Sequence, residues 1–251
     1  MSEMHVAVAP WIAKAREMWA TAETAYETGE TEFAYWAMVD LRASATYREI
    51  AGSELAYCRA EVFSGLSKLL AGSYRNGSLT VFKELGDGVL MRSKNARDLI
   101  EMVCVLDAVR RSWPGSDARR DSPNFNFSAA LNSGECVSLG RNAPGAQEAS
   151  LADYLGRPID LVARLSSFKD PSDERLLMVI EAETAARVQA DLVRDYEFLE
   201  VCTPELLPPK LQKSGEGTAR FCRVRIDRAG FDGVGYPFDC RVSGSLLACR
   251  L

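Results

Sequence analysis

Two aspartates stand where strands are expected to end, and paired carboxylates of this kind can bind divalent metal ions. Asp40 lies near the end of the apolar run FAYWAMVDL (33–41), which suits a buried strand. Asp87 lies between Gly86 and Gly88 in VFKELGDGVLM (81–91), where strand-like residues flank a turn. Carboxylates held close together repel each other unless a cation lies between them. The pattern therefore predicts two divalent ions, Mn²⁺ or Mg²⁺, that activate an attacking oxygen and clamp a phosphate.

The Gly-Asp-Gly sequence also has a simpler explanation, because it is typical of a plain β-hairpin turn. In the metal-site interpretation, the two glycines let the backbone and a triphosphate approach closely. The single histidine, His5, restricts other chemistry, since a Ser-His-Asp triad and a His-rich zinc site both need more. Carboxylates, lysines, arginines and bound metal ions remain as candidate catalytic groups.

Helices and strands alternate along the chain in an order that predicts an α+β fold. We expect a ferredoxin-like layout, with helices packed on one side of a mostly antiparallel sheet, so that the strands carrying Asp40 and Asp87 are neighbours. Ser53 is expected to cap the second helix and Pro114 to stop the third. The expected helices are 9–28, 53–72, 93–113, 156–168 and 184–193, and the expected strands are 33–41, 78–85, 89–91, 125–135, 175–182, 197–202 and 219–227.

The length of 251 residues suits one domain with a full core. We expect a single catalytic domain over 1–251, made of an N-terminal helix (1–30), a catalytic core (31–228) and a C-terminal tail (229–251). The tail has no clean periodicity, and the chain has no internal repeat.

Composition and charge exclude several classes of function. The formal charge of −5 and the pI of about 5.2 argue against a nucleic-acid surface. The seven cysteines form no CxxC pair, which is typical of reduced thiols in a cytosolic protein. We find no signal peptide and no apolar run of roughly 18 residues, so we expect a cytoplasmic protein without a membrane segment.

Three segments in order resemble the class III nucleotidyl cyclases, the catalytic domain of adenylyl and guanylyl cyclases. They are MVDL (38–41), VFKELGDGVLM (81–91) and DYLGRPIDLVARL (153–165), and the similarity covers roughly residues 32–226. In the third segment, Asp153, Gly156 and Arg164 fall at the family's spacing, and the strand RLLMVIEA (175–182) follows as expected.

The resemblance implies a role for each matching residue. Asp40 and Asp87 match the two metal-binding aspartates, with the backbone carbonyl of Leu41 as a further ligand. Lys83 matches the residue that contacts the edge of the base, and Asp153 matches its acidic partner. The remaining matches concern the phosphates: Arg164 corresponds to the arginine that stabilises developing charge, and Lys210 or Lys213 to the lysine that contacts the triphosphate.

The resemblance also implies a homodimer, because in this family each site takes its metal aspartates from one subunit and its base-reading residues and arginine from the other. In the implied reaction, the ribose 3′-oxygen attacks the α-phosphate in line and pyrophosphate leaves. No histidine is needed for this chemistry, which agrees with the composition.

Two positions depart from the family pattern. Most members carry Gly-Phe-Thr after the first metal aspartate, whereas this chain has Ala43-Ser44-Ala45-Thr46, with Tyr47 beyond. Where the family usually has an asparagine that contacts the ribose, this chain has Asp160, and an ionised carboxylate cannot donate a hydrogen bond. Either the contact with the sugar is missing, or Asp160 is protonated or bonds another group.

With no further domain recognised and an altered run after Asp40, this chain resembles the bacterial Pycsar pyrimidine cyclases of anti-phage defence. That resemblance implies synthesis of cyclic UMP or cyclic CMP, which a separate effector protein reads. Lys83 can donate and Asp153 can accept, and each of the four bases satisfies one donor and one acceptor. The volume of the base pocket must therefore determine which base is preferred. A pyrimidine leaves a gap that a purine would fill, and Tyr47 could occupy this gap by stacking on the base. Tyr47 could equally be a core or interface aromatic.

Three hypotheses for the function agree with these residues. The first is a pyrimidine cyclase that prefers UTP to CTP, and the second is an adenylate cyclase. The third is an inactive cyclase-like module that binds a nucleotide or a partner without turnover. The presence of both aspartates and Arg164 argues against the third.

Overall fold

The computed structural model describes residues 2–73, 79–112, 126–138, 154–168, 173, 175–212 and 219–227. The chain divides into two compact units, one of Met1–Phe33 with Gly134–Ile159 and the other of Ala34–Ser133 with Asp160–Leu251. The expected tail (229–251) lies outside the described residues, as does Pro114, the expected stop of the third helix. Among the described helices, none combines the length and the apolar composition needed to cross a lipid bilayer.

The smaller unit contains helix α1 (Ser2–Thr28), the start of β1 (Glu30–Leu41) and a short hairpin-like pairing. Strand β5 (Tyr154–Leu155) pairs antiparallel with the end of β4 (Phe127–Ser138). The Tyr154 hydroxyl donates to the carboxylate of Glu32 over 3.0 Å. Gly156 packs tightly on Cys136, because a Cβ added to Gly156 would lie 3.0 Å from the Cys136 Sγ. This close approach explains the glycine in the third segment, DYLGRPIDLVARL (153–165).

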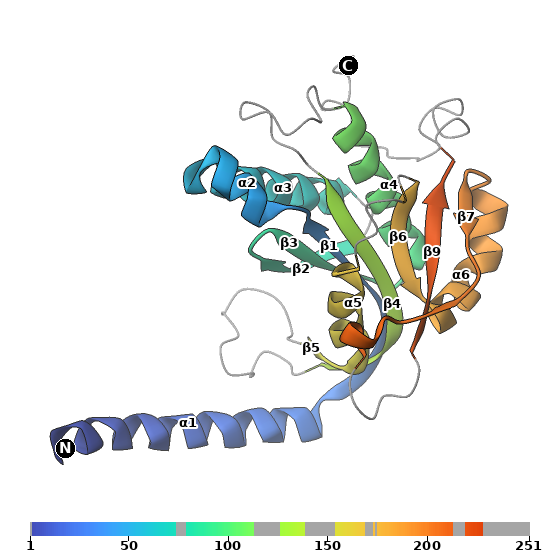
Figure 1. The fold of residues 1–251 in the computed structure, drawn as a ribbon. Coiled ribbons are helices and arrows are strands. Elements are labelled where there is room, and N and C mark those ends of the chain that lie inside the picture. The colour runs from blue at the N-terminus through green and yellow to red at the C-terminus, as the bar shows by residue number, and fades with distance from the viewer. Residues whose placement is uncertain are drawn as a thin grey trace. The chain divides into compact units, whose positions relative to one another are not determined.

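The larger unit is built on a mixed sheet of strands in the order β2-β3-β1-β4-β6-β9-β7 (Figure 1). Strands β4 and β6 pair in parallel, while β1 with β3, β2 with β3, β6 with β9 and β7 with β9 pair antiparallel. The α+β expectation of a mostly antiparallel sheet with packed helices is therefore confirmed. The strands not yet bounded are β2 (Leu79–Leu85), β3 (Gly88–Ser93), β6 (Leu176–Glu181), β7 (Leu199–Val201), β8 (Glu205–Leu206, paired with β9) and β9 (Arg220–Ile226).

One face of this sheet packs against α3 (Ser53–Ser73), α4 (Ala96–Ser112) and α6 (Ala182–Asp195). Alternate residues of β1, such as Val39 and Leu41, enter this core because successive side chains of a strand point to opposite faces. Phe63 of α3 and Leu99 of α4 meet them there and are 2% and 0% exposed. This packing holds the ends of β1 and β3, where Asp40 and Asp87 lie.

Helix α5 (Arg157–Ser166) is the exception to the expected one-sided packing. The Phe168 ring, just beyond α5, lies 4.9 Å from the ring of Phe221, centroid to centroid. Phe221 is next to Cys222 on β9, and Cys222 belongs to the core on the other face. Because neighbours on a strand point to opposite faces, the end of α5 lies across the sheet from α3, α4 and α6.

Several short elements escaped the sequence analysis. Helix α2 (Ser44–Ala51) was not expected, and Gly52, with φ of +92°, separates it from α3. The expected cap at Ser53 is wrong by one residue: the carbonyl of Gly52 accepts the first helical bond, from the amide of Ala56. The other elements missed are the two-residue strands β5 and β8 and the 3₁₀ turn η2 (Pro209–Leu211).

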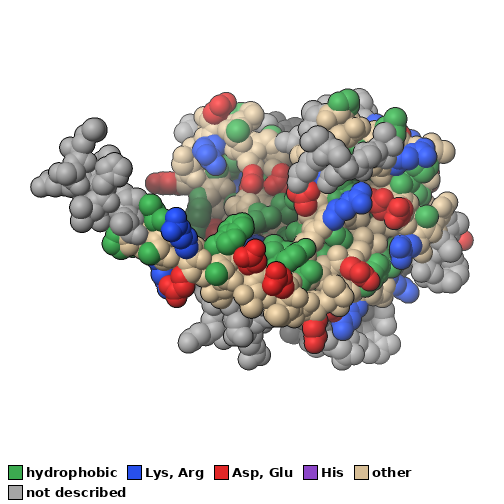
Figure 2. Space-filling view, turned by 90° about the horizontal axis from the view of Figure 1, so that it is seen from below, with side chains coloured by type: hydrophobic (Ala, Val, Ile, Leu, Met, Phe, Trp, Pro, Cys, Tyr) green, Lys and Arg blue, Asp and Glu red, His purple; other side chains and the backbone are tan. Residues whose placement is uncertain are grey.

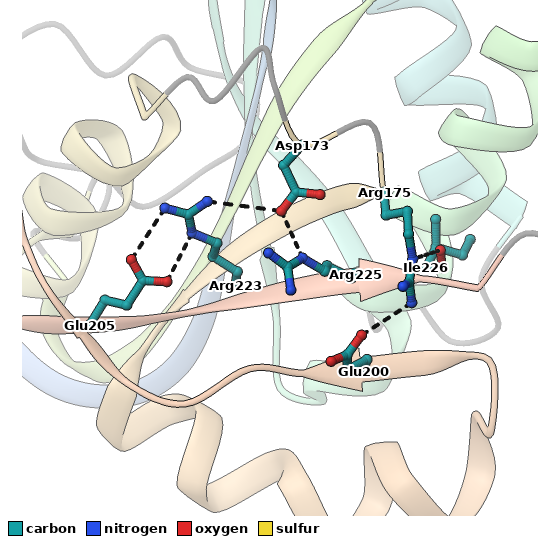
Figure 3. A network of polar contacts seen from close by, with 7 residues as sticks. All are labelled: Asp173, Arg175, Glu200, Glu205, Arg223, Arg225 and Ile226. Carbon is teal, nitrogen blue, oxygen red and sulfur yellow. Dashed lines mark hydrogen bonds and ion pairs between the residues drawn. The ribbon is translucent and has the colours of Figure 1, made fainter.

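A network of ion pairs fastens the strands around β9 (Figure 3). Arg223 binds Glu205 of β8 over 2.9 Å, and Asp173 accepts from Arg225 over 2.7 Å. Arg175 reaches Glu200 of β7 over 3.1 Å. Partly exposed pairs contribute about 1 kcal/mol or less each, so their main effect is to fix geometry. They hold the segment that leads from β8 into η2, which carries Lys210 and Leu211.

The five described cysteines are thiols that form no disulfide with one another, as the scattered spacing predicted. Cys104, Cys136 and Cys222 are buried, Cys58 is exposed, and Cys202 is half-buried. Burial raises the pKa of the Cys222 thiol, which keeps it protonated and unreactive at neutral pH.

Candidate active site

Asp40 lies directly opposite Gly88 across the β1–β3 pair, so the two strands expected to be neighbours are neighbours. A Cβ on Gly88 would lie 3.0 Å from Oδ1 of Asp40 and 2.7 Å from Cε of Met38. Glycine at position 88 therefore makes room for the Asp40 carboxylate, which is half-buried.

Asp87 occupies the tip of the β2–β3 hairpin, one residue before Gly88. Gly86, the first residue of the two-residue turn, has φ of +70°, as a type II′ turn requires. The backbone of Asp87 is fixed to β1, because its carbonyl accepts the amide of Leu41 over 3.0 Å. The hairpin interpretation and the metal-site interpretation are thus compatible, since the turn itself presents Asp87 beside Asp40.

The loop after β1 is held in an unusual conformation. Ala43 has φ of +57°, a left-handed conformation that costs roughly 1–2 kcal/mol for a residue with a Cβ. In the cyclase resemblance, it begins the Ala43-Ser44-Ala45-Thr46 run that takes the place of Gly-Phe-Thr. Ser44 Oγ donates to the carbonyl of Leu41 over 3.1 Å, and the amide of Arg42 donates to the carbonyl of Asn126 over 2.7 Å. These bonds orient the carbonyl that the resemblance assigns to the metal.

A buried arginine that the sequence analysis missed lies beside this loop. Arg59 of α3 is 3% exposed, and its Nη2 donates to the carbonyl of Arg42 over 2.9 Å. Burial lowers the pKa of its guanidinium, while the nearby Tyr47 and Asp87 oppose that shift. An arginine stays charged in proteins, so Arg59 places a positive charge near the Asp87 carboxylate.

Tyr47 of α2 stacks on this arginine. The Arg59 Cζ lies 4.9 Å from the centre of the Tyr47 ring, within the range of a cation–π contact. The ring is half-buried beside the loop that carries Asp40 and Leu41. One face of Tyr47 is therefore covered by Arg59, and a base could stack only on its other face.

The donor set formed by Asp40, Asp87 and the Leu41 carbonyl fits a hard divalent cation, because all three supply oxygen atoms. Among the described residues, no group of three or more His, Cys, Asp or Glu side chains is placed to hold a metal ion. Two carboxylates and one carbonyl leave coordination positions for water and for substrate phosphates, the arrangement that Mg²⁺ prefers.

A second group of residues surrounds Arg164 on α5. Its Nη2 lies 3.0 Å from Oδ2 of Asp160, one turn earlier, and its Nε donates to the same oxygen over 3.2 Å. Its Nη1 donates to the carbonyl of Leu211 over 2.8 Å, next to Lys210 in η2. The Arg164 side chain is 15% exposed and that of Asp160 is 41% exposed. Asp160 is therefore bonded to Arg164, which is one of the alternatives expected from its position.

The remaining candidates are only partly described. Lys83 is exposed on β2, beside an irregularity in the pairing with β3. Lys210 lies in η2, while Asp153 and Lys213 lie outside the described residues. The structure thus brings Asp40, Leu41, Asp87 and Tyr47 together and, separately, Asp160 with Arg164 and the turn that contains Lys210.

Comparison with known proteins agrees with this architecture. No protein-family profile matches the chain, and no curated protein sequence matches it. Solved structures do match. The guanylyl cyclase Cya2 is 16% identical with a TM-score of 0.58, over 80% of this chain and 95% of that one.

Two further structures have the same kind of fold. The guanylate cyclase domain of RhGC from Catenaria anguillulae, solved with GTP, is 12% identical with a TM-score of 0.55, over 78% of this chain and 98% of that one. A bacterial light-regulated adenylyl cyclase is 13% identical with a TM-score of 0.50, over 79% of this chain and 91% of that one. The chain therefore has the fold of the class III guanylyl and adenylyl cyclase catalytic domains.

Proposed function

We propose that the chain is a nucleotide cyclase that converts a nucleoside triphosphate into a 3′,5′-cyclic nucleotide and pyrophosphate. The observation that carries this proposal is the pairing of Asp40 with Gly88, which presents Asp40 and the hairpin-tip Asp87 side by side on a cyclase fold. Arg164 supplies a cation on a separate element, next to the turn that contains Lys210.

In this proposal, Asp40, Asp87 and the Leu41 carbonyl hold two divalent ions, Mn²⁺ or Mg²⁺. The bound ions supply positive charge that lowers the pKa of the ribose 3′-hydroxyl and stabilises the phosphates. The new bond joins O3′ to the α-phosphorus, the 3′-hydroxyl proton is lost, and the bond from the α-phosphorus to the bridging oxygen breaks as pyrophosphate leaves.

The role of Arg164 follows from its chemistry. A planar guanidinium with several N–H donors suits the equatorial oxygens of the α-phosphoryl group, where negative charge builds up. Asp160 holds this guanidinium from one side, so that it is oriented before substrate arrives. Lys210 or Lys213 would contact the triphosphate as a further positive charge.

We further propose that each site is shared between two copies of the chain. Asp40 and Asp87 would come from one subunit, and Lys83, Asp153 and Arg164 from the other. For Arg164, support comes from its place on α5 beside η2, apart from Asp40 on β1 and Asp87 at the tip of the β2–β3 hairpin. A homodimer would then contain two composite sites.

The preferred substrate in this proposal is UTP, and the product cyclic UMP would act as a messenger in anti-phage defence, read by a separate effector. The support is the position of Tyr47 beside the loop after β1, where Arg59 contacts one face of its ring. A fixed aromatic ring narrows a base pocket and favours a single-ring base. Lys83 and Asp153 would contact the base edge, and the reaction would take place in the cytoplasm.

Cytidylate and adenylate cyclases are the alternatives within this class, because the Lys83–Asp153 pair does not distinguish the bases. An inactive nucleotide-binding module is the alternative outside it. Incubation of the purified protein with each of the four nucleoside triphosphates and Mn²⁺, followed by mass spectrometry of the products, separates all of these. Cyclic UMP as the main product supports the proposal, whereas no cyclic product from any triphosphate would leave only the binding module.

A further inference from the structure

We infer that α1 is an assembly helix, which pairs with α1 of a second copy of this chain through one apolar face. The α1 apolar face is defined as Trp11, Ile12, Ala15, Met18, Trp19, Ala22 and Tyr26. This inference goes beyond the proposed reaction and does not rest on it.

No described residue of the smaller unit covers this face, although it carries some of the largest apolar side chains in the sequence. Trp11 is 75% exposed and Trp19 is 73% exposed. Ile12, Met18 and Tyr26 are about half exposed. In the space-filling view (Figure 2), the described part of α1 shows apolar side chains together with basic and acidic ones. An uncovered row of large apolar side chains on one helix marks an interaction site.

The spacing of the face specifies a helical partner. Ile12, Trp19 and Tyr26 stand seven residues apart, with Ala15 and Ala22 between them. Trp11 and Met18 precede the first two, again seven residues apart. Apolar residues repeated every seven positions form the seam of helices that pack side by side. The alanines leave shallow gaps into which large side chains of a facing helix can fit.

The helix also needs a partner for its own stability. It spans 27 residues, and every residue from 10 to 28 whose burial is described is exposed, apart from the half-buried Ala22. Most helical stability in proteins comes from packing an amphipathic face, because a helix that buries nothing is marginal in water. The described residues of the smaller unit do not supply that packing for residues 10–28.

Charge argues against a membrane surface as the covering partner. Residues 10–28 contain Lys14 and Arg16 but also Glu17, Glu23 and Glu27, so this stretch is net acidic. Helices that lie on anionic lipid surfaces carry an excess of lysine and arginine on the polar face. A second protein helix places no such demand on charge.

The area available suits a pair of identical helices. Each buried aromatic contributes on the order of 150–250 Å², so two copies of the face could bury roughly 1,000 Å² in total. That area lies near the lower end of specific protein interfaces. Added to any contact between catalytic domains, it would raise the affinity of a dimer without any new binding site on the core.

The first test measures self-association of the full-length protein by sedimentation equilibrium. Trp19→Glu should raise the dimer dissociation constant at least about tenfold, as expected for a central aromatic contact. Thr24→Glu is the matched control on the opposite side of the helix and should leave the constant within about twofold. An unchanged constant for Trp19→Glu, with unchanged circular dichroism, would overturn the inference.

The second test locates the partner. In a Cys58→Ser background, Ala22→Cys should form a covalent dimer with a short bismaleimide, while Ala20→Cys, on the opposite side, should not. The competing partner is the exposed apolar side of α3, which contains Leu55, Cys58, Val62 and Leu69. If Ala22→Cys cross-links only when Cys58 is retained, α1 docks on α3 and the inference is wrong.

A third measurement separates lipid binding from assembly. Wild type and Trp19→Glu are spun with phosphatidylcholine vesicles containing phosphatidylserine. Co-sedimentation of the wild type that Trp19→Glu abolishes, together with an unchanged dissociation constant, would assign the face to a membrane. Because no readout here involves turnover, an inactive chain that assembles through α1 would disprove the proposed function and leave this inference standing.

Discussion

The carboxylate of Asp160 holds the guanidinium of Arg164 through two contacts to one oxygen, at 3.0 and 3.2 Å. The two residues are four positions apart on α5, so they lie on the same side of the helix. Asp160 stands where the cyclase resemblance leads one to expect an asparagine, so the pair adds a negative charge to the candidate site. Its consequence is that the candidate transition-state arginine is already partly neutralised before substrate binds.

Asp160→Asn should lower the KM for the nucleotide triphosphate, because it removes a negative charge close to the proposed phosphate site. A loss of repulsion on the order of 1 kcal/mol corresponds to roughly a fivefold decrease in KM. Steady-state kinetics measures the effect, with Asp160→Ala as the control that removes the carboxylate without adding an amide. A KM that rises in both variants would contradict this prediction, because the lost positioning of Arg164 would then outweigh the relief of repulsion.

Gly88→Ala should damage both stability and activity. The added Cβ would lie 2.7 Å from Met38 Cε and 3.3 Å from the carbonyl of Val39, besides crowding Asp40. Overpacking of this kind costs about 1–3 kcal/mol, which urea denaturation can measure. Gly72→Ala near the end of α3 is the control, since its Cβ would meet nothing within 4 Å. Equal stability of the two variants would show that position 88 tolerates a side chain.

Arg59→Met should destabilise the protein by about 1–3 kcal/mol, since it leaves the Arg42 carbonyl without its charged donor. It also removes the support of the Tyr47 ring. Arg59→Lys keeps the charge but loses the fork of N–H groups, so it should recover only part of the stability. Arg48→Met on the exposed side of α2 is the control. Thermal and urea unfolding give the free energy of unfolding of the three variants. A value for Arg59→Met equal to that of the wild type would contradict the prediction.

The sequence predicted the sheet and the position of the aspartates well because the relevant signals are local. The turn Gly86-Asp87-Gly88 fixes the β2–β3 hairpin, and the apolar run before Asp40 identifies β1 as its buried neighbour. The pairing of Asp160 with Arg164 was also within reach of the sequence, since acidic and basic residues four apart on a helix meet by default.

Other parts of the site depend on contacts that the sequence does not encode locally. Arg59 sits in an apolar helical stretch, and only the tertiary fold determines that it is buried against the loop after β1. Helix α2 depends on the left-handed Ala43, an unfavourable conformation that no sequence pattern predicts. Strand β8 has only two residues, and its conformation depends on backbone pairing with β9 and on the ion pair between Arg223 and Glu205.

A mixture of two inactive variants should regain activity if the sites are composite. In the proposed site, Asp87→Ala would remove a metal ligand and Arg164→Ala the phosphate-binding cation, so each homodimer should be inactive. A mixed dimer has one site with both defects and one with neither, which predicts up to about a quarter of wild-type activity after subunit exchange. Product formation in the mixture is the measurement. Continued inactivity after demonstrated exchange would place both residues in one subunit's site.

Tyr47→Ala tests the preference for UTP. If the ring stacks on a pyrimidine, its removal should cost roughly 1–2 kcal/mol of transition-state stabilisation, a five- to thirtyfold decrease in kcat/KM for UTP. The decrease for ATP should be smaller, because a purine fills the space without the ring. Tyr47→Phe keeps the ring and its contact with Arg59, so it should retain most of the UTP activity. An equal decrease for UTP and ATP would mean that Tyr47 supports the loop after β1 without selecting the base. That result, or faster turnover of ATP than of UTP by the wild type, would favour an adenylate cyclase.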